Sequence, residues 1–449
     1  MWEFKVFYYM ISIMQKIRQF ILIIGDIALA FLALLLTLNL RYWGNLNSFV
    51  LNQHIVPFTI IYLVWIIFFY IFGLYDLKII GPKSELVQRM IQCFSVCLVV
   101  GLTFFYLIPF FGITPKTNLL LNTAIFAILI FLWRKFFYTL FSSVYRANIA
   151  FLGKMPLALA LSNEIKNQPQ LGYKLIGFLN AKSSLSAQIK KHKINVLIVS
   201  GNVEKNSTLA EQLYQCLSLK VTFLSLDKAY EKILGKIPID FVSQAWFLKN
   251  LSESEKSTYD KIKRLTDFII AVALIILTSP FWLIASLAIK LDDKGPIFYK
   301  QERVGRNRKN FSIFKFRSMI VNAEKRGAMW AEKKDPRVTA VGKVLKKFHI
   351  DEFPQMLNVL KGELSLTGPR PERPEFVKTL EKEIPHYNLR HIVKPGFTGW
   401  AQTRFIQYAR SIDESHEKFQ YDLYYIKNRS FLLDLGILLK TFLLFFKTE

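Results

Sequence analysis

The sequence predicts a membrane protein of mixed α and α/β class. We expect a four-helix transmembrane bundle, a small α/β domain, and a mainly helical domain with one re-entrant membrane helix. Of the 449 residues, 52% are apolar and 20% are charged. This apolar share is high for a soluble protein. Long apolar runs fill the first third, and short strands then alternate with amphipathic helices. We place the three domains at residues 1–146, 147–248 and 249–449.

The charge balance narrows the possible partners. The formal net charge is +26, which favours an anionic partner such as anionic lipid, a phosphorylated small molecule or nucleic acid. The apolar runs make lipid a better explanation than nucleic acid. The three cysteines, Cys93, Cys97 and Cys216, form neither a CxxC metal motif nor a disulfide framework.

The transmembrane bundle is predicted from four apolar runs, each long enough to cross a bilayer as a helix. They cover roughly residues 20–40, 55–75, 91–111 and 119–138. Basic residues gather before the first run, between the second and third, and after the fourth, where Arg134 and Lys135 stand. The positive-inside rule then places both ends of the bundle in the cytoplasm. Asp26 lies inside the first run, and we expect it to face a partner on another helix.

The middle domain is predicted to be a degenerate Rossmann-like α/β domain. Its strands are expected at 147–153, 174–180, 195–201 and 220–226, with helices between them. A dinucleotide site needs G-x-G-x-x-G after the first strand, and Gly153 alone is present there. We therefore expect an assembly or regulatory role. Tyr259 and Lys263 have the YxxxK spacing of short-chain dehydrogenases, which we attribute to chance.

The apolar segment 265–291 is long enough for a fifth crossing, but two features favour a re-entrant helix. Ser279 and Pro280 lie at its middle, where proline removes a backbone hydrogen bond. Both flanks are basic, so a crossing would carry one basic cluster to the outer face. We expect a helix–break–helix that enters and leaves on the cytoplasmic side; a plain fifth crossing is the alternative.

The candidate site lies between His349 and Phe376. Asp351 and Glu352 stand at a predicted helix start, and Pro369-Arg370-Pro371 forms a stiff loop. Adjacent carboxylates suit a Mg²⁺ site completed by substrate phosphates, and a proline-fixed arginine suits a phosphate. The alternative is that Asp351 is simply a helix cap. Upstream, residues 294–317 interleave basic and aromatic side chains, which suits a surface in lipid headgroups that attracts a phosphorylated substrate.

The C-terminal half, about residues 265–449, resembles the bacterial sugar transferases, the polyprenyl-phosphate hexose-1-phosphate transferases. The whole chain resembles the long initiating enzymes of exopolysaccharide, capsule or O-antigen assembly. The matching segments run in the family's order: Ser279-Pro280, KLDDKGPIFYKQERVG (290–305), FKFRSM (314–319), DPRVTAVG (335–342), IDEFPQMLNVLKGELSLTGPRPE (350–372), VKPGFTGWAQ and YDLYYIKN.

The resemblance implies a monotopic catalytic domain that transfers sugar 1-phosphate from a UDP-hexose to undecaprenyl phosphate and releases UMP. It implies roles for individual residues, which are as follows. Asp351 matches the nucleophile, and Glu352 matches the partner that holds Mg²⁺ with it. Lys315 and Arg317 match phosphate ligands, and the loop that holds the nucleotide is matched by Pro369, Arg370 and Pro371. The hinge of the re-entrant helix is matched by Ser279 and Pro280. The family usually has arginine at the position of Lys346. Lysine cannot bind a phosphate through two parallel hydrogen bonds as arginine does.

We accordingly expect UDP-hexose, undecaprenyl phosphate and membrane lipids as partners, and no nucleic acid. Glucose or galactose is the expected sugar, by resemblance to the long relatives. A homodimer through the middle domain is expected, in the bacterial inner membrane with the catalytic domain on the cytoplasmic face. Two other functions stay open: a membrane-bound sugar-nucleotide dehydratase, which needs bound NAD, and a non-enzymatic scaffold of a polysaccharide assembly complex.

Overall fold

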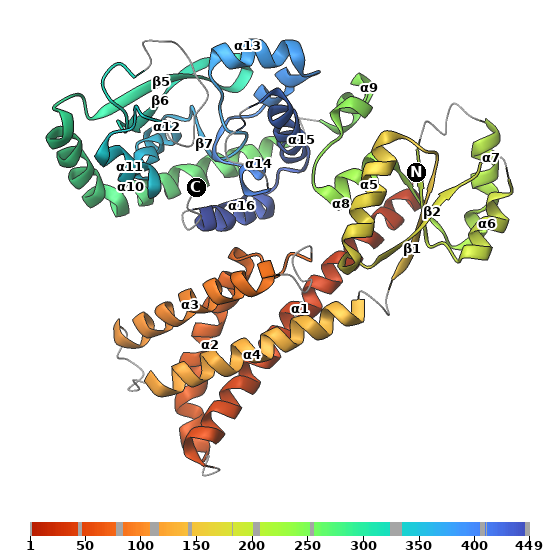
Figure 1. The fold of residues 1–449 in the computed structure, drawn as a ribbon, viewed down its shortest axis with the longest axis horizontal. Helices are drawn as coiled ribbons and strands as arrows, with labels where there is room; N and C mark the ends of the chain where they lie inside the picture. The colour runs from red at the N-terminus through yellow and green to blue at the C-terminus, as the bar shows by residue number, and fades with distance from the viewer. Residues whose placement is uncertain are drawn as a thin grey trace. The chain divides into compact units, whose positions relative to one another are not determined.

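The structure is a computed structural model, and it divides into two compact units, Met1–Ala229 and Tyr230–Glu449 (Figure 1). It describes residues 2–43, 47–77, 84–107, 116–141, 146–181, 183–200, 207–251, 256–323, 335–404, 409 and 411–444. Lys78 and Lys83, which contribute to the charge argument for orientation, lie outside the described residues.

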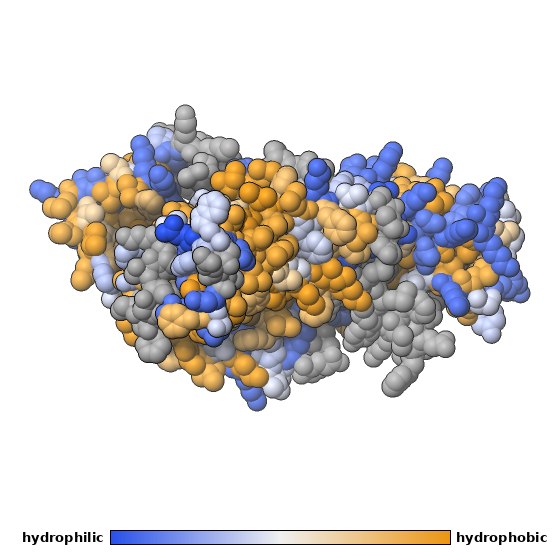
Figure 2. Space-filling view, turned by 90° about the horizontal axis from the view of Figure 1, so that it is seen from below, coloured by the Kyte–Doolittle hydropathy of each residue, from blue (hydrophilic) through white to orange (hydrophobic). Residues whose placement is uncertain are grey.

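Four long apolar helices open the first unit: α1 (Trp2–Tyr42), α2 (Ser48–Ile71), α3 (Ser84–Leu107) and α4 (Lys116–Thr139). Aromatic side chains fill the space between them, with Trp65 and Phe69 stacked on Phe126. Many outward side chains, among them Leu63, Ile91 and Ile128, are exposed and apolar. Figure 2 shows broad apolar areas on the face in view. All four helices are long and apolar enough to cross a membrane, as α10 (Ser257–Asp293) of the second unit also is.

Asp26 has the helix partner that we expected. Both of its carboxylate oxygens accept from Arg134 of α4, at 2.8 and 2.7 Å, and both side chains are fully buried. A charge buried among apolar helices is stabilised only when it is paired and hydrogen-bonded, as this one is. Arg134 is therefore an internal ion-pair partner, and it does not act as a flanking basic residue of the fourth apolar run.

The α/β part of the first unit confirms the small parallel sheet. Strands β1 (Ala147–Leu152), β2 (Tyr173–Leu179), β3 (Val196–Val199) and β4 (Thr222–Ser225) are parallel in the order β2-β1-β3-β4. Figure 1 shows α5 (Pro156–Asn167) on one face and α6 (Leu185–His192) with α7 (Ser207–Gln215) on the other. Gly153 follows β1 with φ +95°, which favours glycine, and Ser200 lies 3.2 Å from where its Cβ would be, closer than an ordinary van der Waals contact.

The segment that follows the parallel sheet, Tyr230–Asn250, packs into the core of the second unit. After α8 (Leu226–Leu234) and before α9 (Gln244–Asn250), Ile237, Ile239 and Val242 join the apolar core of the C-terminal unit, as does Phe247 of α9. Glu231 accepts from Lys427 at 2.6 Å. The structure therefore assigns Tyr230–Asn250 to the C-terminal unit, whereas the sequence placed the boundary after residue 248.

The second unit is built around α10 (Ser257–Asp293) and the antiparallel hairpin of β5 (Phe298–Val304) and β6 (Asn310–Phe316). Short parallel strands β7 (Ser365–Thr367) and β8 (Gly396–Thr398) lie in its interior. The remaining helices are α11 (Ala340–Lys347), α12 (Gln355–Lys361), α13 (Pro374–Glu383), α14 (Trp400–Arg404), α15 (Ile412–Asn428) and α16 (Phe431–Leu444). Ala271 of α10 packs with Ile313 and Val359, and Ile289 packs with Phe316 and Leu345.

Helix α10 differs from the expected helix–break–helix, because it is one continuous helix through Ser279 and Pro280. Pro280 has no N–H to donate to the carbonyl of Ile276, four residues earlier. The hydroxyl of Ser279 donates to that same carbonyl at 2.8 Å. A side-chain hydrogen bond thus replaces the missing backbone one, and the helix continues where the sequence predicted a break. A re-entrant path then requires a bend at Pro280 and not an interruption of the helix.

Tyr259 and Lys263 also have a structural explanation. The hydroxyl of Tyr259 donates to Asp434 at 2.5 Å, and the ammonium of Lys263 donates to the same carboxylate at 2.7 Å. Tyr425 donates to its other oxygen. These contacts join α10, α15 and α16, so the YxxxK spacing reflects a shared acceptor on α16.

Candidate active site

The segment that carries Asp351 and Glu352 is a tight turn between two helices. The N-cap of α11 is Thr339, and the helix ends just before His349, whose φ of +52° redirects the chain. A 3-10 turn over Ile350–Glu352 follows, and Pro354 precedes α12. Pro354 fits the first turn because its missing N–H has no helical acceptor there. Asp351 and Glu352 thereby lie at the start of a helical segment, as predicted, and are buried at 6% and 4% exposure.

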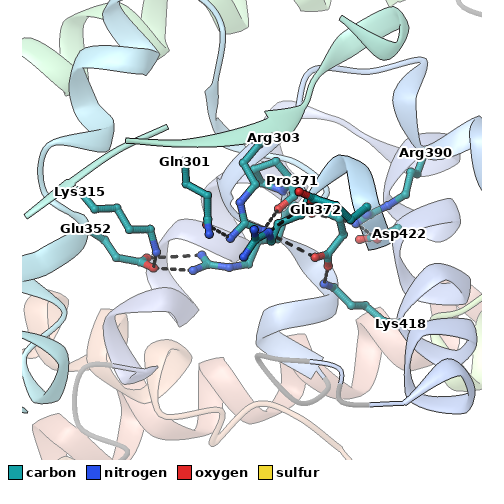
Figure 3. Close-up of polar contacts among 12 residues, drawn as sticks. Gln301, Arg303, Lys315, Glu352, Pro371, Glu372, Arg390, Lys418 and Asp422 are labelled. Atoms are coloured by element: carbon teal, nitrogen blue, oxygen red, sulfur yellow. Dashed lines mark hydrogen bonds and ion pairs between the residues drawn. The ribbon is translucent and has the colours of Figure 1, made fainter. Parts of the chain in front are cut away.

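Glu352 is held by two cations that come from distant parts of the sequence. Its Oε1 accepts from Lys315 of β6 at 2.8 Å and from Arg370 at 2.5 Å, and its Oε2 accepts from Arg370 at 3.4 Å (Figure 3). Burial acts to raise the pKa of Glu352, but Arg370 and Lys315 outweigh it and hold that pKa well below its usual range. Glu352 is therefore ionised at neutral pH.

Asp351 has the opposite environment. No described side chain donates a hydrogen bond to its carboxylate, although Lys315, Lys346 and Arg370 are close enough to act on its charge. Burial raises the pKa of Asp351 to about 6; Lys315 works against the rise, and Glu352 adds to it. Two adjacent carboxyls thus differ in role: one is fixed in ion pairs, and the other is a buried acceptor whose lone pairs are available to an electrophile.

The Pro-Arg-Pro loop is fixed by its backbone. Gly368 and Gly396 approach so closely that a Cβ on either would overlap the backbone of the other. The N–H of Gly396 donates to the carbonyl of Pro369 at 2.9 Å. Arg390 donates to the carbonyl of Arg370 at 2.9 Å, and Arg303 donates to that of Pro371 at 3.0 Å. Three successive loop carbonyls are therefore held, and the Arg370 side chain projects to Glu352.

Behind this loop lies a charged network whose residues were given no role by the sequence. Glu372 accepts from Lys418 at 2.6 Å and pairs with Arg303, while Arg390 pairs with Asp422 at 2.8 Å (Figure 3). Burial acts to raise the pKa of Glu372, but Lys418, Arg390 and Arg303 lower it to about 2. A signal was available: Lys418 and Asp422 are charged residues four apart in the aromatic-rich part of α15, KFQYDLYYIKN, and so lie on one face of the helix.

The structure brings together most of the predicted site residues. Asp351, Glu352, Lys315, Lys346 and Arg370 act on one another, and Pro369 and Pro371 shape the loop. Arg317 belongs elsewhere by its contacts: it is ion-paired with Asp293 at the end of α10, and its Nη1 is buried without an acceptor in the described structure. Ser279 and Pro280 lie within α10.

The adjacent carboxylates of Asp351 and Glu352 are the candidate ligands for a metal ion. Within the described residues, no three His, Cys, Asp or Glu side chains cluster as a metal site. Mg²⁺ is commonly bound by one or two carboxylates together with substrate phosphates, and Asp351 with Glu352 meets that lesser requirement. Because Glu352 is engaged by Lys315 and Arg370, a bound ion must share it or displace one cation. A substrate diphosphate offers both cations another anionic partner.

Comparisons with known proteins show which family the chain resembles. A family model described as bacterial sugar transferase matches residues 258–448. The UDP-N-acetylgalactosamine-undecaprenyl-phosphate N-acetylgalactosaminephosphotransferase of Aeromonas hydrophila is 44% identical over 229 residues, 51% of this chain and 53% of that protein. The match thus covers about half the length of that relative.

Two further relatives extend the comparison. The UDP-glucose:undecaprenyl-phosphate glucose-1-phosphate transferase of Klebsiella pneumoniae is 30% identical over 66% of this chain and 67% of that protein. The exopolysaccharide production protein PSS of Rhizobium leguminosarum bv. phaseoli is 36% identical over 40% of this chain and 92% of that protein. The last match covers nearly the whole of that relative with 40% of this chain.

Proposed function

The chain belongs to the bacterial sugar transferase family, and we propose that it transfers sugar 1-phosphate from a UDP-hexose to undecaprenyl phosphate, releasing UMP. The observation that carries the proposal is the contrast between the two carboxyls of the Asp351–Glu352 dyad. Glu352 is ionised and held by Lys315 and Arg370, while the carboxylate of Asp351 beside it accepts no hydrogen bond from a described side chain.

The proposed reaction proceeds in two displacements. A carboxylate oxygen of Asp351 attacks the phosphorus that bears the sugar, and the bond from that phosphorus to the bridging oxygen breaks, so that UMP leaves. An oxygen of undecaprenyl phosphate then attacks the phosphosugar held on Asp351, and the carboxylate leaves. Two easier steps replace one difficult step.

The cations of the site have a defined part in both displacements. Lys315 and Arg370, freed from Glu352 as the diphosphate enters, neutralise the charge that gathers on the transferring oxygens. Asp351 and Glu352 would hold Mg²⁺, which supplies Lewis-acid stabilisation of phosphate oxygens when bound. The rigid carbonyl contacts of the loop keep Arg370 in place while its guanidinium changes partners.

The sugar is proposed from the relatives' names. One relative at 44% identity is named for N-acetylgalactosamine, and one at 30% for glucose. We therefore take UDP-N-acetylgalactosamine as the first donor to test, ahead of the glucose or galactose expected from the sequence.

The membrane arrangement is also a proposal. Arg264, near the start of α10, donates to the carbonyls of Val359 and Leu360, and Asp293, at its end, pairs with Arg317. Both ends of this apolar helix are thus fastened to one polar unit, which a helix that crosses a bilayer does not allow. We propose that α10 is re-entrant, that α1–α4 cross the inner membrane, and that the site faces the cytoplasm.

The test is UMP release by detergent-purified protein with undecaprenyl phosphate, Mg²⁺ and a panel of UDP-sugars that includes N-acetylgalactosamine, glucose and galactose. We expect continuous release with one donor, and without the lipid we expect release to stop after one UMP per active site. Chelation of the metal should abolish release. No release across the panel from folded protein would contradict the proposed function and favour the scaffold interpretation.

A further inference from the structure

Gln355, the first residue of α12, has a buried donor that the structure leaves unused. The side chain is 1% exposed, and its Nε2 has no acceptor within the described part of the chain. A buried amide group without a partner is expensive, typically by about 1–3 kcal/mol, and native proteins seldom keep one without a reason. The arrangement therefore points to an acceptor that arrives with a ligand.

The neighbouring groups cannot supply that acceptor. Asn358, one turn further along α12, is saturated: its Nδ2 donates to Ser312 and Glu363, and its Oδ1 accepts from the N–H of Phe314. The carboxylate of Glu352 is taken by Lys315 and Arg370. Asp351 is thus left as the acceptor without a hydrogen-bond donor on this segment, and Gln355 is left as the donor without an acceptor.

The two side chains lie one turn apart along the same helical segment. Hydrogen bonds from Met356 to Phe353 and from Leu357 to Pro354 continue the turn that holds Asp351 into α12. On a segment of mixed 3-10 and α geometry, residues three and four apart lie within about one turn of each other. A tetrahedral phosphoryl group fits between an acceptor and a donor of this kind, since its phosphorus is electrophilic and its non-bridging oxygens accept hydrogen bonds.

We propose that Gln355 is a catalytic residue whose Nε2 donates to a non-bridging oxygen of the sugar phosphate while that group is attached to Asp351. This rests on the proposed function. The donor gains charge-assisted strength as the phosphorus is attacked, and no proton is transferred. Gln355 thereby recognises the phosphoryl group, which is common to every donor in the panel, and it does not distinguish sugars.

The experiment is a burst measurement without the lipid acceptor, in which folded enzyme and UDP-sugar yield one UMP per active site. Gln355→Met keeps the length of the side chain and removes the donor. We expect its burst to be about 10- to 100-fold slower than wild type, the range that a hydrogen bond to a charged group supplies. Its Tm should be unchanged or raised, because an unpaired buried donor is removed.

Gln420→Met is the matched control. Gln420 is also buried, but its Oε1 accepts from Tyr230 and its Nε2 contacts His416. We expect this variant to lower the Tm and to leave the burst rate of folded enzyme unchanged. A burst less than fivefold slower in Gln355→Met overturns the inference alone. A wild-type enzyme with no burst on any donor overturns the proposed function together with it.

Discussion

At the scale of single residues, neighbouring carboxyls acquire different chemistry from their surroundings. Glu352 is paired with Lys315 and Arg370, and its pKa is held low. Asp351 is buried without a hydrogen-bond donor among the described side chains, and its pKa is raised to about 6. A buried, unpaired carboxylate lowers the stability of the fold above that pH, and such strain is typical of a group kept for reaction.

Replacing Asp351 with asparagine should separate activity from stability. We expect turnover to fall by about 10³-fold or more, because the amide cannot attack phosphorus. The raised native pKa means that the ionised form destabilises the native state as pH rises through about 6. The variant should therefore be more stable than wild type at pH 8, by roughly 1–3 kcal/mol, with the difference shrinking toward pH 4. Denaturant unfolding at both pH values measures this. Equal stability at pH 8 would contradict it.

The pH dependence of the burst rate should report Asp351 directly. The rate should fall on the acid side with a midpoint near pH 6, because the protonated carboxyl cannot attack. Lys315 lowers the pKa of Asp351, so Lys315→Met should move this midpoint to higher pH, whatever it does to the maximal rate. A midpoint that stays in place in Lys315→Met would show that another group controls the acid limb.

At the scale of elements, the Pro-Arg-Pro loop is rigid because buried charges hold its carbonyls. Pro369 and Pro371 predicted a stiff loop. The structure adds that the held carbonyls of this loop direct the Arg370 side chain toward Asp351 and Glu352. The guanidinium of Arg390 donates to the Arg370 carbonyl, to Asp422 and to Tyr387. Local sequence predicts the loop from its prolines, but the residues behind it come from α15 and the 387–391 turn, which only tertiary folding brings near.

Arg390→Lys should weaken both the fold and the reaction. One ammonium cannot match the planar guanidinium that serves three acceptors, so buried oxygens are left unpaired. We expect a loss of about 2–4 kcal/mol in unfolding free energy and a roughly tenfold slower burst in the folded enzyme. Arg308→Lys is the control, since Arg308 pairs with Glu381 at 59% exposure and should change stability by less than about 0.5 kcal/mol. An Arg390→Lys burst equal to wild type would show that Arg370 needs no such support.

At the scale of the whole molecule, periodicity and charge predicted the apolar helices, the small parallel sheet and the position of the dyad. The predictions from these patterns differ from the structure where a single tertiary contact determines the local fold. The hydroxyl of Ser279 keeps α10 helical through Pro280, and Trp400 donates to the carbonyl of Gly235, part of the segment that joins the C-terminal core. No local pattern reveals which carbonyl a serine will reach or which unit a connector will join.

The last prediction concerns where the two ends of α10 lie. Lys261 and Lys294 are exposed at opposite ends of this helix, and Arg264 and Asp293 fasten both ends to the same unit. In a chain with Cys93, Cys97 and Cys216 replaced by alanine, Lys261→Cys and Lys294→Cys should both react with an impermeant maleimide in inside-out vesicles and not in intact cells. Asn47→Cys, between α1 and α2, should show the reverse. If Lys261→Cys and Lys294→Cys react from opposite sides, α10 crosses the bilayer, and the contacts that fasten its two ends cannot coexist in the membrane.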